Sequence, residues 1–270
     1  MKQRERAEAT AEYILQSKVG LQVNPVPTST TETPEFQVDG DGRGYLVEVK
    51  TRYNSEQWRE DIHSGEAALE SRSLGWSRWA EDVARKAVSQ LAALDPSHER
   101  WWILWISVAV EPTGTTAVQE VFGSLFGTRQ AAYWDEDGKG RYRDCLYAMP
   151  GVFERHPELC ACVIDPSGFG PVNIAINEFA PDKESFETSK LYRTAVENHA
   201  LVTEAGLVER NWMVCDRGLE RRDEAVVATH LQEKYGLEKV MILNIQEHSA
   251  SMFVPHEAKN GPGGEAGNQA

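Results

Sequence analysis

A nearly uninterrupted apolar segment, RWWILWISVAV at residues 100–110, restricts most strongly how this chain can fold. In a strand, successive side chains point to opposite faces of the sheet, and in this segment both sets are apolar. Such a strand is fully buried only inside a sheet whose two faces are both covered. We therefore expect an α/β protein with a mixed central sheet flanked by helices.

The segment before this strand has the spacing of an amphipathic helix. Apolar residues recur every three or four positions through residues 77–94, and Asp95-Pro96 ends the pattern. A helix that joins two strands of one sheet is a crossover connection, which makes those two strands parallel. Upstream, the pattern predicts a helix at 4–18 and strands at 19–26, 36–38 and 45–52, the last two joined by a GDGRG turn.

The rest of the chain reads as an α/β extension. We expect helices around 116–126, 183–199 and 223–235, and strands around 159–164, 172–179, 212–215 and 240–245. The expected division is a core at 1–112, an extension at 113–255 that could belong to the same domain, and a disordered, almost wholly polar tail at 256–270.

Composition restricts the class of protein. The chain is 41% apolar without a run of eighteen apolar residues, and its first residues lack the apolar segment of a secretory signal. We expect a cytoplasmic protein with no membrane partner. The spacing of Cys145, Cys160, Cys162 and Cys215 fits buried free thiols better than a zinc or disulfide framework. A net charge of −14 argues against sequence-independent attraction to nucleic acid unless metal ions and a local basic rim meet the substrate.

The strand YLVEVKT at 45–51 carries the candidate chemistry. Alternation places Glu48 and Lys50 on one face, about 7 Å apart at their Cα atoms. Phosphodiester hydrolysis needs a hard cation held by oxygen ligands and a group that orients or deprotonates water. Glu48 could bind the cation, and Lys50 could position the attacking water or offset the developing negative charge. Glu35, on the preceding strand, could supply a second carboxylate, with Asp39 and Asp41 as rivals for that position.

An acid-x-Lys tripeptide alone is weak grounds for a site. The chain has three, and Asp137-Gly138-Lys139 falls in a Gly-rich turn while Glu257-Ala258-Lys259 falls in the tail, where neither is held rigidly. Only Glu48-Val49-Lys50 lies on an expected strand preceded by a Pro-acid-Phe strand and a turn. Without that context, the pair would be an ordinary exposed ion pair.

With that context, residues 4–110 resemble the PD-(D/E)XK, or restriction-endonuclease-like, nuclease superfamily. The resemblance implies a restriction-endonuclease-like core and a Mg²⁺ (or Mn²⁺) site formed by Glu35, Glu48 and, from the first helix, Glu12. It gives Lys50 the role of assisting the nucleophilic water. Glu35 departs from the pattern, which usually has Asp there. Lys86 and Gln90 lie four apart on the 77–94 helix and could approach the scissile phosphate, or belong to a solvated helix face.

The expected function is therefore metal-dependent hydrolysis of nucleic acid, DNA in preference to RNA. Cleavage of both strands of a duplex usually requires two active sites, and a homodimer would supply them. The alternative is a catalytically inactive version of the fold that binds partner proteins in a larger complex, which the acidic charge and Glu35 favour.

Two further groups have structural interpretations. The tryptophans Trp101, Trp102 and Trp105 could stack on bases, but their apolar neighbours favour a buried sheet core. The basic cluster Arg217, Arg221 and Arg222 could grip phosphate, but we favour pairing with nearby acids.

Overall fold

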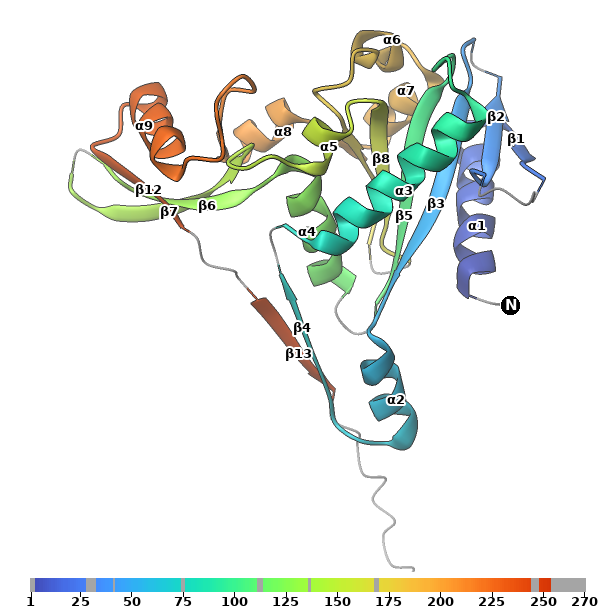
Figure 1. Cartoon of the computed structure of the whole chain (residues 1–270), viewed down its shortest axis with the longest axis horizontal. Coiled ribbons are helices and arrows are strands. Elements are labelled where there is room, and N and C mark those ends of the chain that lie inside the picture. The colour runs from blue at the N-terminus through green and yellow to red at the C-terminus, as the bar shows by residue number, and fades with distance from the viewer. Residues whose placement is uncertain are drawn as a thin grey trace, which may run out of the picture.

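The computed structural model describes residues 3–27, 33–40, 42–73, 76–110, 114–135, 137–167, 170–243 and 248–253. A seven-stranded mixed sheet forms its centre (Figure 1). In spatial order its strands are β1 (Gln22–Pro25), β2 (Phe36–Asp39), β3 (Tyr45–Tyr53), β5 (Trp101–Ala109), β8 (Leu159–Asp165), β9 (Asn173–Ile176) and β10 (Leu201–Val202). The helices packed around it include α1 (Gln3–Tyr13), η1 (Ile14–Val19), α3 (Arg78–Leu94), α4 (Gly114–Phe126), α5 (Val152–Arg155), α6 (Lys183–Glu187) and α7 (Lys190–Glu197). The predicted class, α/β with a flanked mixed sheet, is confirmed.

The apolar segment forms β5, in the middle of the sheet. It pairs in parallel with β3 on one side and with β8 on the other. Its residues from Trp101 to Val108 are all buried, so the three tryptophans belong to the core as predicted. The crossover from β3 to β5 contains α3, which begins and ends within one residue of the predicted bounds.

Each face of the sheet has its own hydrophobic core. On one face, Leu46 and Leu104 pack with the α3 residues Ala84 and Leu91. On the other face, alternate residues of the same strands, including Val47, pack against α1, η1 and α7. Figure 1 shows α3 lying across β3, β5 and β8, with α1 beyond β3. The two faces of β3 therefore meet different helices, and this alternation decides which side chains reach the candidate site.

The opening helix is confirmed, with one addition. The predicted helix at 4–18 is α1 continued by the wider turns of the π-helix η1. Gly20 ends it in a left-handed conformation, with φ of 72°.

The remaining elements are α2 (Glu56–Ser64), β4 (Ala68–Ser73), β6 (Arg129–Trp134), β7 (Gly140–Leu146), α8 (Glu204–Glu209), β11 (Met213–Val214), α9 (Glu224–Tyr235), β12 (Lys239–Leu243) and β13 (His248–Phe253). Four of these strands form a second sheet in the order β11-β7-β6-β12, and α9 covers one of its faces. β13 pairs with β4, so a late segment forms a two-stranded ribbon with an early one. The predicted extension thus supplies strands to all three sheets. The predicted tail at 256–270 lies outside the described residues.

Several sequence predictions need correction. The polar stretch at 54–75, for which no element was predicted, contains α2 and β4, and the β6–β7 hairpin was not predicted. The single helix expected at 183–199 is two helices, α6 and α7. They are separate because the Ser189 side chain accepts a hydrogen bond from the Tyr192 amide, at 3.2 Å, and starts a new helix.

The four cysteines are free and buried, as predicted. Within the described part of the chain, no helix has the length and apolar character needed to cross a bilayer.

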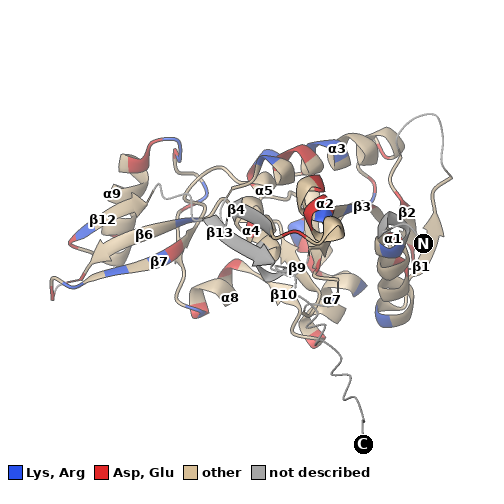
Figure 2. Ribbon diagram, turned by 90° about the horizontal axis from the view of Figure 1, so that it is seen from below, with Lys and Arg blue, Asp and Glu red and all other residues tan. Residues whose placement is uncertain are grey.

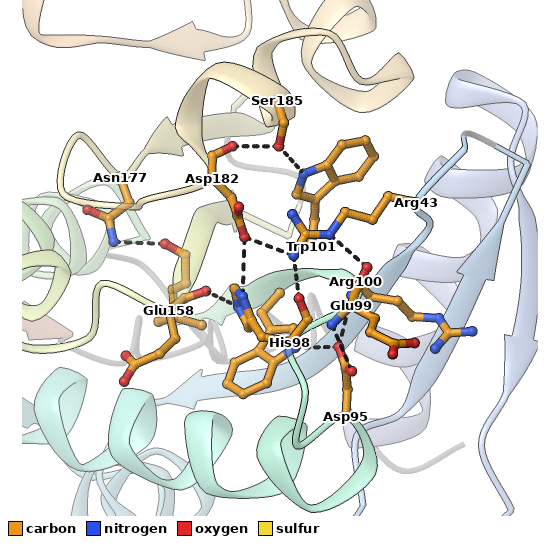
Figure 3. Close-up of polar contacts among 12 residues, drawn as sticks. Arg43, Asp95, His98, Glu99, Arg100, Trp101, Glu158, Asn177, Asp182 and Ser185 are labelled. Carbon is orange, nitrogen blue, oxygen red and sulfur yellow. Dashed lines mark hydrogen bonds and ion pairs between the residues drawn. The ribbon is translucent and has the colours of Figure 1, made fainter.

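A polar network fixes the amino end of β5 (Figure 3). Arg43, in the β2–β3 turn, pairs with Asp182 at 2.8 Å, and the His98 ring lies between the Asp182 carboxylate and the Glu158 carbonyl oxygen. Three segments distant in sequence are thereby joined where β5 begins. The opposite, carboxyl ends of β3 and β5 are left for the candidate site.

Asp95 is the hydrogen-bond acceptor at the centre of the α3–β5 connection. Its carboxylate accepts from the Glu99 and Arg100 amides, each at 2.9 Å, and from the Trp102 indole at 3.1 Å. Burial opposes ionisation of this carboxyl, but the two amide bonds and the indole bond outweigh it and lower its pKa.

We expect Asp95→Ala to lower the free energy of unfolding by about 2–4 kcal/mol, because it leaves the buried Trp102 indole and two part-buried amides without their acceptor. Because the folded pKa lies below the unfolded one, the stabilisation is present above the unfolded pKa and is lost as pH falls through the folded value. Urea titrations at a series of pH values measure both effects. Asp82→Ala, in an exposed pair with Arg85, is the control and should change stability by under about 0.5 kcal/mol. Equal effects of the two substitutions would contradict the account.

Candidate active site

The candidate site lies on the face of β3 that is turned toward α3 and α4. Alternation along β3 places Glu48, Lys50 and Arg52 on this face. The Glu48 side chain is fully buried, while the Lys50 side chain is 21% exposed. The polar side chains on this face of β3 therefore run from the interior, at Glu48, toward solvent, at Lys50.

Glu35 lies opposite Glu48. The register pairs Phe36 with Val47, so one step further along the antiparallel strands Glu35 faces Glu48 on the same side of the sheet. The Glu35 carboxylate is held there by the Val49 amide, which donates to its Oε2 at 2.8 Å. The two predicted carboxyl groups therefore converge from neighbouring strands.

The environment of Glu48 favours its protonated form. Burial, the hydrogen bond with the Glu35 carboxyl and the negative charge of Glu35 raise its pKa to about 9, against the opposing effect of Lys50. The Lys50 ammonium contacts Glu48 Oε1 and forms an ion pair with it when Glu48 is ionised. Apart from the Glu35 carboxyl and the Lys50 ammonium, no described residue donates a hydrogen bond to either Glu48 oxygen. Two buried acceptor atoms thus face a second carboxyl group, which is an unfavourable arrangement unless a proton or a cation lies between them.

Gln90 holds the other side of Lys50. The Lys50 ammonium donates to Gln90 Oε1 at 2.9 Å, and Gln90 Nε2 donates to the Thr33 carbonyl oxygen at 3.2 Å. Gln90 is buried, so the structure brings this predicted residue into the site through Lys50. Lys86, one turn earlier on α3, is exposed to solvent.

The other predicted ligands lie elsewhere. Glu12 belongs to α1, which packs on the opposite face of the sheet through Ala7 and Ala11, and its carboxylate accepts a hydrogen bond from Gln16 at 3.2 Å. Asp39 lies at the turn end of β2 and accepts from Asn24 at 3.0 Å. Asp41 lies outside the described residues. Among the residues that the structure describes, no three acids, histidines or cysteines are gathered as a metal site would gather them.

The Glu35–Glu48 pair nevertheless has the chemistry that a hard divalent cation requires. Carboxylate oxygens are its preferred ligands, and those of Glu48 are buried with few competing donors. A cation bound there would replace the proton that the raised pKa of Glu48 retains, and would remove the repulsion between the two carboxylates. Solvent would have to supply the remaining ligands.

Two neighbours of the site, Arg52 and Glu120, were not among the residues predicted to belong to it. The Arg52 guanidinium donates from one nitrogen to both carboxylate oxygens of Glu120 on α4, at 3.1 and 3.3 Å. It also lies over the ring of Trp79, with 4.7 Å from Cζ to the ring centroid. The alternation of β3 placed Arg52 on the correct face, but only the packing of α4 reveals its partner.

Two other basic groups have local partners. Arg217 pairs with the Glu178 carboxylate at 3.6 Å and Arg221 pairs with Glu154, so two of the three arginines of the predicted cluster offset acids as expected. The side chains of Lys139 and Asp137, in the β6–β7 turn, are 70% and 74% exposed, so this acid-x-Lys pair lies in solvent. Figure 2 shows acidic and basic residues interspersed along α3 and along the β6–β7 hairpin.

Comparison with protein-family models, with curated proteins and with solved structures gives no match. The function must therefore be argued from the geometry of the site.

Proposed function

We propose that this chain is a Mg²⁺-dependent nuclease that hydrolyses a phosphodiester bond of nucleic acid, DNA in preference to RNA. The observation that carries the proposal is the convergence of the Glu35 and Glu48 carboxyl groups beside the Lys50 ammonium. The element order α1–β1–β2–β3–α3–β5 supports the finer proposal of a restriction-endonuclease-like core, because the resemblance of residues 4–110 implies that order. α2 and β4 would then be an insertion between β3 and α3.

Each residue has a distinct role in this proposal. Glu35 and Glu48 would hold the divalent cation, which supplies charge stabilisation for the phosphate and lowers the pKa of water. Lys50 would orient the attacking water or offset the negative charge that develops on the phosphate. Gln90 keeps the Lys50 ammonium at a fixed place by accepting one of its protons.

Glu48 must lose its proton before it can bind a cation. Since its pKa is raised to about 9, a cation competes with a proton throughout the neutral range. Metal affinity and cleavage should therefore rise with pH between about 6 and 9.

Calorimetric titration with Mn²⁺ tests the site directly. We expect wild-type protein to bind Mn²⁺, and Glu48→Gln to weaken the binding at least about tenfold, because an amide oxygen replaces a charged ligand. Asp39→Asn is the matched control, since this acid lies on the same strand pair but away from Glu48, and it should leave binding unchanged.

A second candidate is the catalytically inactive module. Two observations favour it: the Lys50 ammonium already forms an ion pair with Glu48, and no third acid joins the pair among the described residues. This candidate predicts no Mn²⁺ binding that depends on Glu48. Identical titrations of wild type and Glu48→Gln would decide in its favour.

A further inference from the structure

Arg52 continues the row of polar side chains on β3. It follows Lys50 by two residues, so the two side chains project from the same face about 7 Å apart at their Cα atoms. Each side chain is 21% exposed, although Nε of the Arg52 guanidinium is itself buried. The strand thus presents two positive groups in line, starting beside the carboxyl pair.

The position of the Arg52 guanidinium is fixed from two sides. Glu120, whose side chain is 4% exposed, holds one guanidinium nitrogen through both carboxylate oxygens, and the Trp79 ring supports the guanidinium plane. Glu120 is fixed in turn, because the Ser124 hydroxyl donates to its backbone carbonyl at 2.8 Å and accepts from the Ser77 amide. A fixed guanidinium loses little conformational entropy when it binds an anion.

We propose that Arg52 binds the backbone phosphate next to the one that is cleaved, and that Glu120 is its positioning residue. This rests on the proposed function and extends it. The substrate strand would run along the exposed end of β3, with the reacting phosphate at Lys50 and its neighbour at Arg52. A net charge of −14 disfavours nucleic-acid binding in general, so contacts with individual phosphates through placed cationic groups such as Arg52 gain in importance.

A purely structural ion pair would have different consequences. If Arg52 only joined β3 to α4, its removal would change stability without changing how binding depends on salt. A phosphate contact releases counterions, so its loss lowers the slope of log K against log salt concentration by about 0.7 to 0.9. The slope therefore separates the two roles.

The experiment measures binding of labelled single- and double-stranded DNA oligonucleotides by anisotropy over a series of salt concentrations. Ca²⁺ replaces Mg²⁺, and a gel checks that the oligonucleotide stays intact. We expect Arg52→Gln to bind about tenfold more weakly, with the slope reduced by about one phosphate contact, and Arg52→Lys to restore the slope. Glu120→Gln should weaken binding severalfold and leave the slope unchanged, because the charge remains but is less well placed.

Arg141→Gln is the matched control, since Arg141 also pairs with an acid, Asp135 at 3.0 Å, but lies on β7. Its slope should equal that of wild type. If Arg52→Gln does not fold, the double variant Arg52→Gln/Glu120→Gln, which leaves no unpaired buried charge, replaces it. If wild type cleaves DNA but the variant that folds has the wild-type salt slope, the proposed role of Arg52 is wrong and the proposed function still stands. Failure of wild type to bind or cleave would instead overturn the proposed function.

Discussion

Lys50→Met should reduce the rate of phosphodiester cleavage at least about 100-fold while leaving the melting temperature within a few degrees of wild type. The large effect is expected because the ammonium is the cationic group that lies against Glu48. Methionine keeps most of the aliphatic volume but can neither orient water nor offset charge. The folding cost should be modest, because the Lys50 side chain is partly exposed and the main loss is the hydrogen bond that it donates to Gln90.

The measurement is a time course on a labelled DNA fragment with Mg²⁺, with EDTA as the blank. Lys139→Met is the matched control, because Lys139 also follows an acid at two positions but lies in an exposed turn. It should cleave at the wild-type rate. Undiminished cleavage by Lys50→Met would exclude the proposed role, and an equal loss in both variants would point to a general effect of charge on substrate binding.

The central part of the fold could be predicted because its signals are local. β5 is apolar on both faces, α3 has a regular helical period, and a Gly-rich sequence lies between two strands, β2 and β3, that pair in antiparallel orientation. The antiparallel pairing of β2 with β3 alone places Glu35 opposite Glu48. The pairing of two carboxyl groups is thus a consequence of short-range sequence.

The missed elements depend on partners that are distant in sequence. β4 lies in a polar stretch, and its partner strand β13 comes at the end of the described chain, at 248–253. The β6–β7 hairpin has one face covered by α9, so half of its residues are polar and its strand signal is weak. Neither segment forms a regular element through its own apolar pattern.

The same distinction applies to the site. Glu12 was assigned to the metal from the resemblance, but α1 contributes small residues, Ala7 and Ala11, to the core on the opposite face, and the structure leaves Glu12 away from Glu48. Gln90 could be placed on the correct helix, yet its contact with Lys50 depends on how α3 crosses β3. Glu120 reaches Arg52 only because α4 packs beside both.

In metal-free protein, Glu48→Gln should increase stability at pH 8 by several kcal/mol relative to wild type and have little effect at pH 5. The folded pKa of Glu48, about 9, lies above its unfolded value of 4.5. The stability that its protonated form contributes is therefore fully present below 4.5 and is lost as pH rises toward 9. The loss is at most about 1.4 kcal/mol for each pH unit. Glutamine resembles the protonated acid and does not titrate, so the variant escapes this loss.

Urea unfolding in EDTA at pH 5, 6.5 and 8 measures the difference. Glu120→Gln is the control, since it also replaces a buried glutamate but removes the ion pair with Arg52, and it should lose stability at every pH. A constant difference between Glu48→Gln and wild type across this range would mean that Glu48 does not take up a proton on folding.

Adding Mg²⁺ to the same titrations connects this stability effect to the proposed function. A cation that binds the folded site stabilises it by an amount that grows with the logarithm of its concentration over the dissociation constant. At pH 8, Mg²⁺ should therefore restore the free energy of unfolding that the wild-type protein loses through its carboxyl pair. The free energy of unfolding of Glu48→Gln should not change when Mg²⁺ is added. A protein that binds a cation is expected to hold two carboxyl groups close together even though their proximity lowers its stability. If Mg²⁺ does not stabilise the wild-type protein, cation binding does not explain why these two groups are held together.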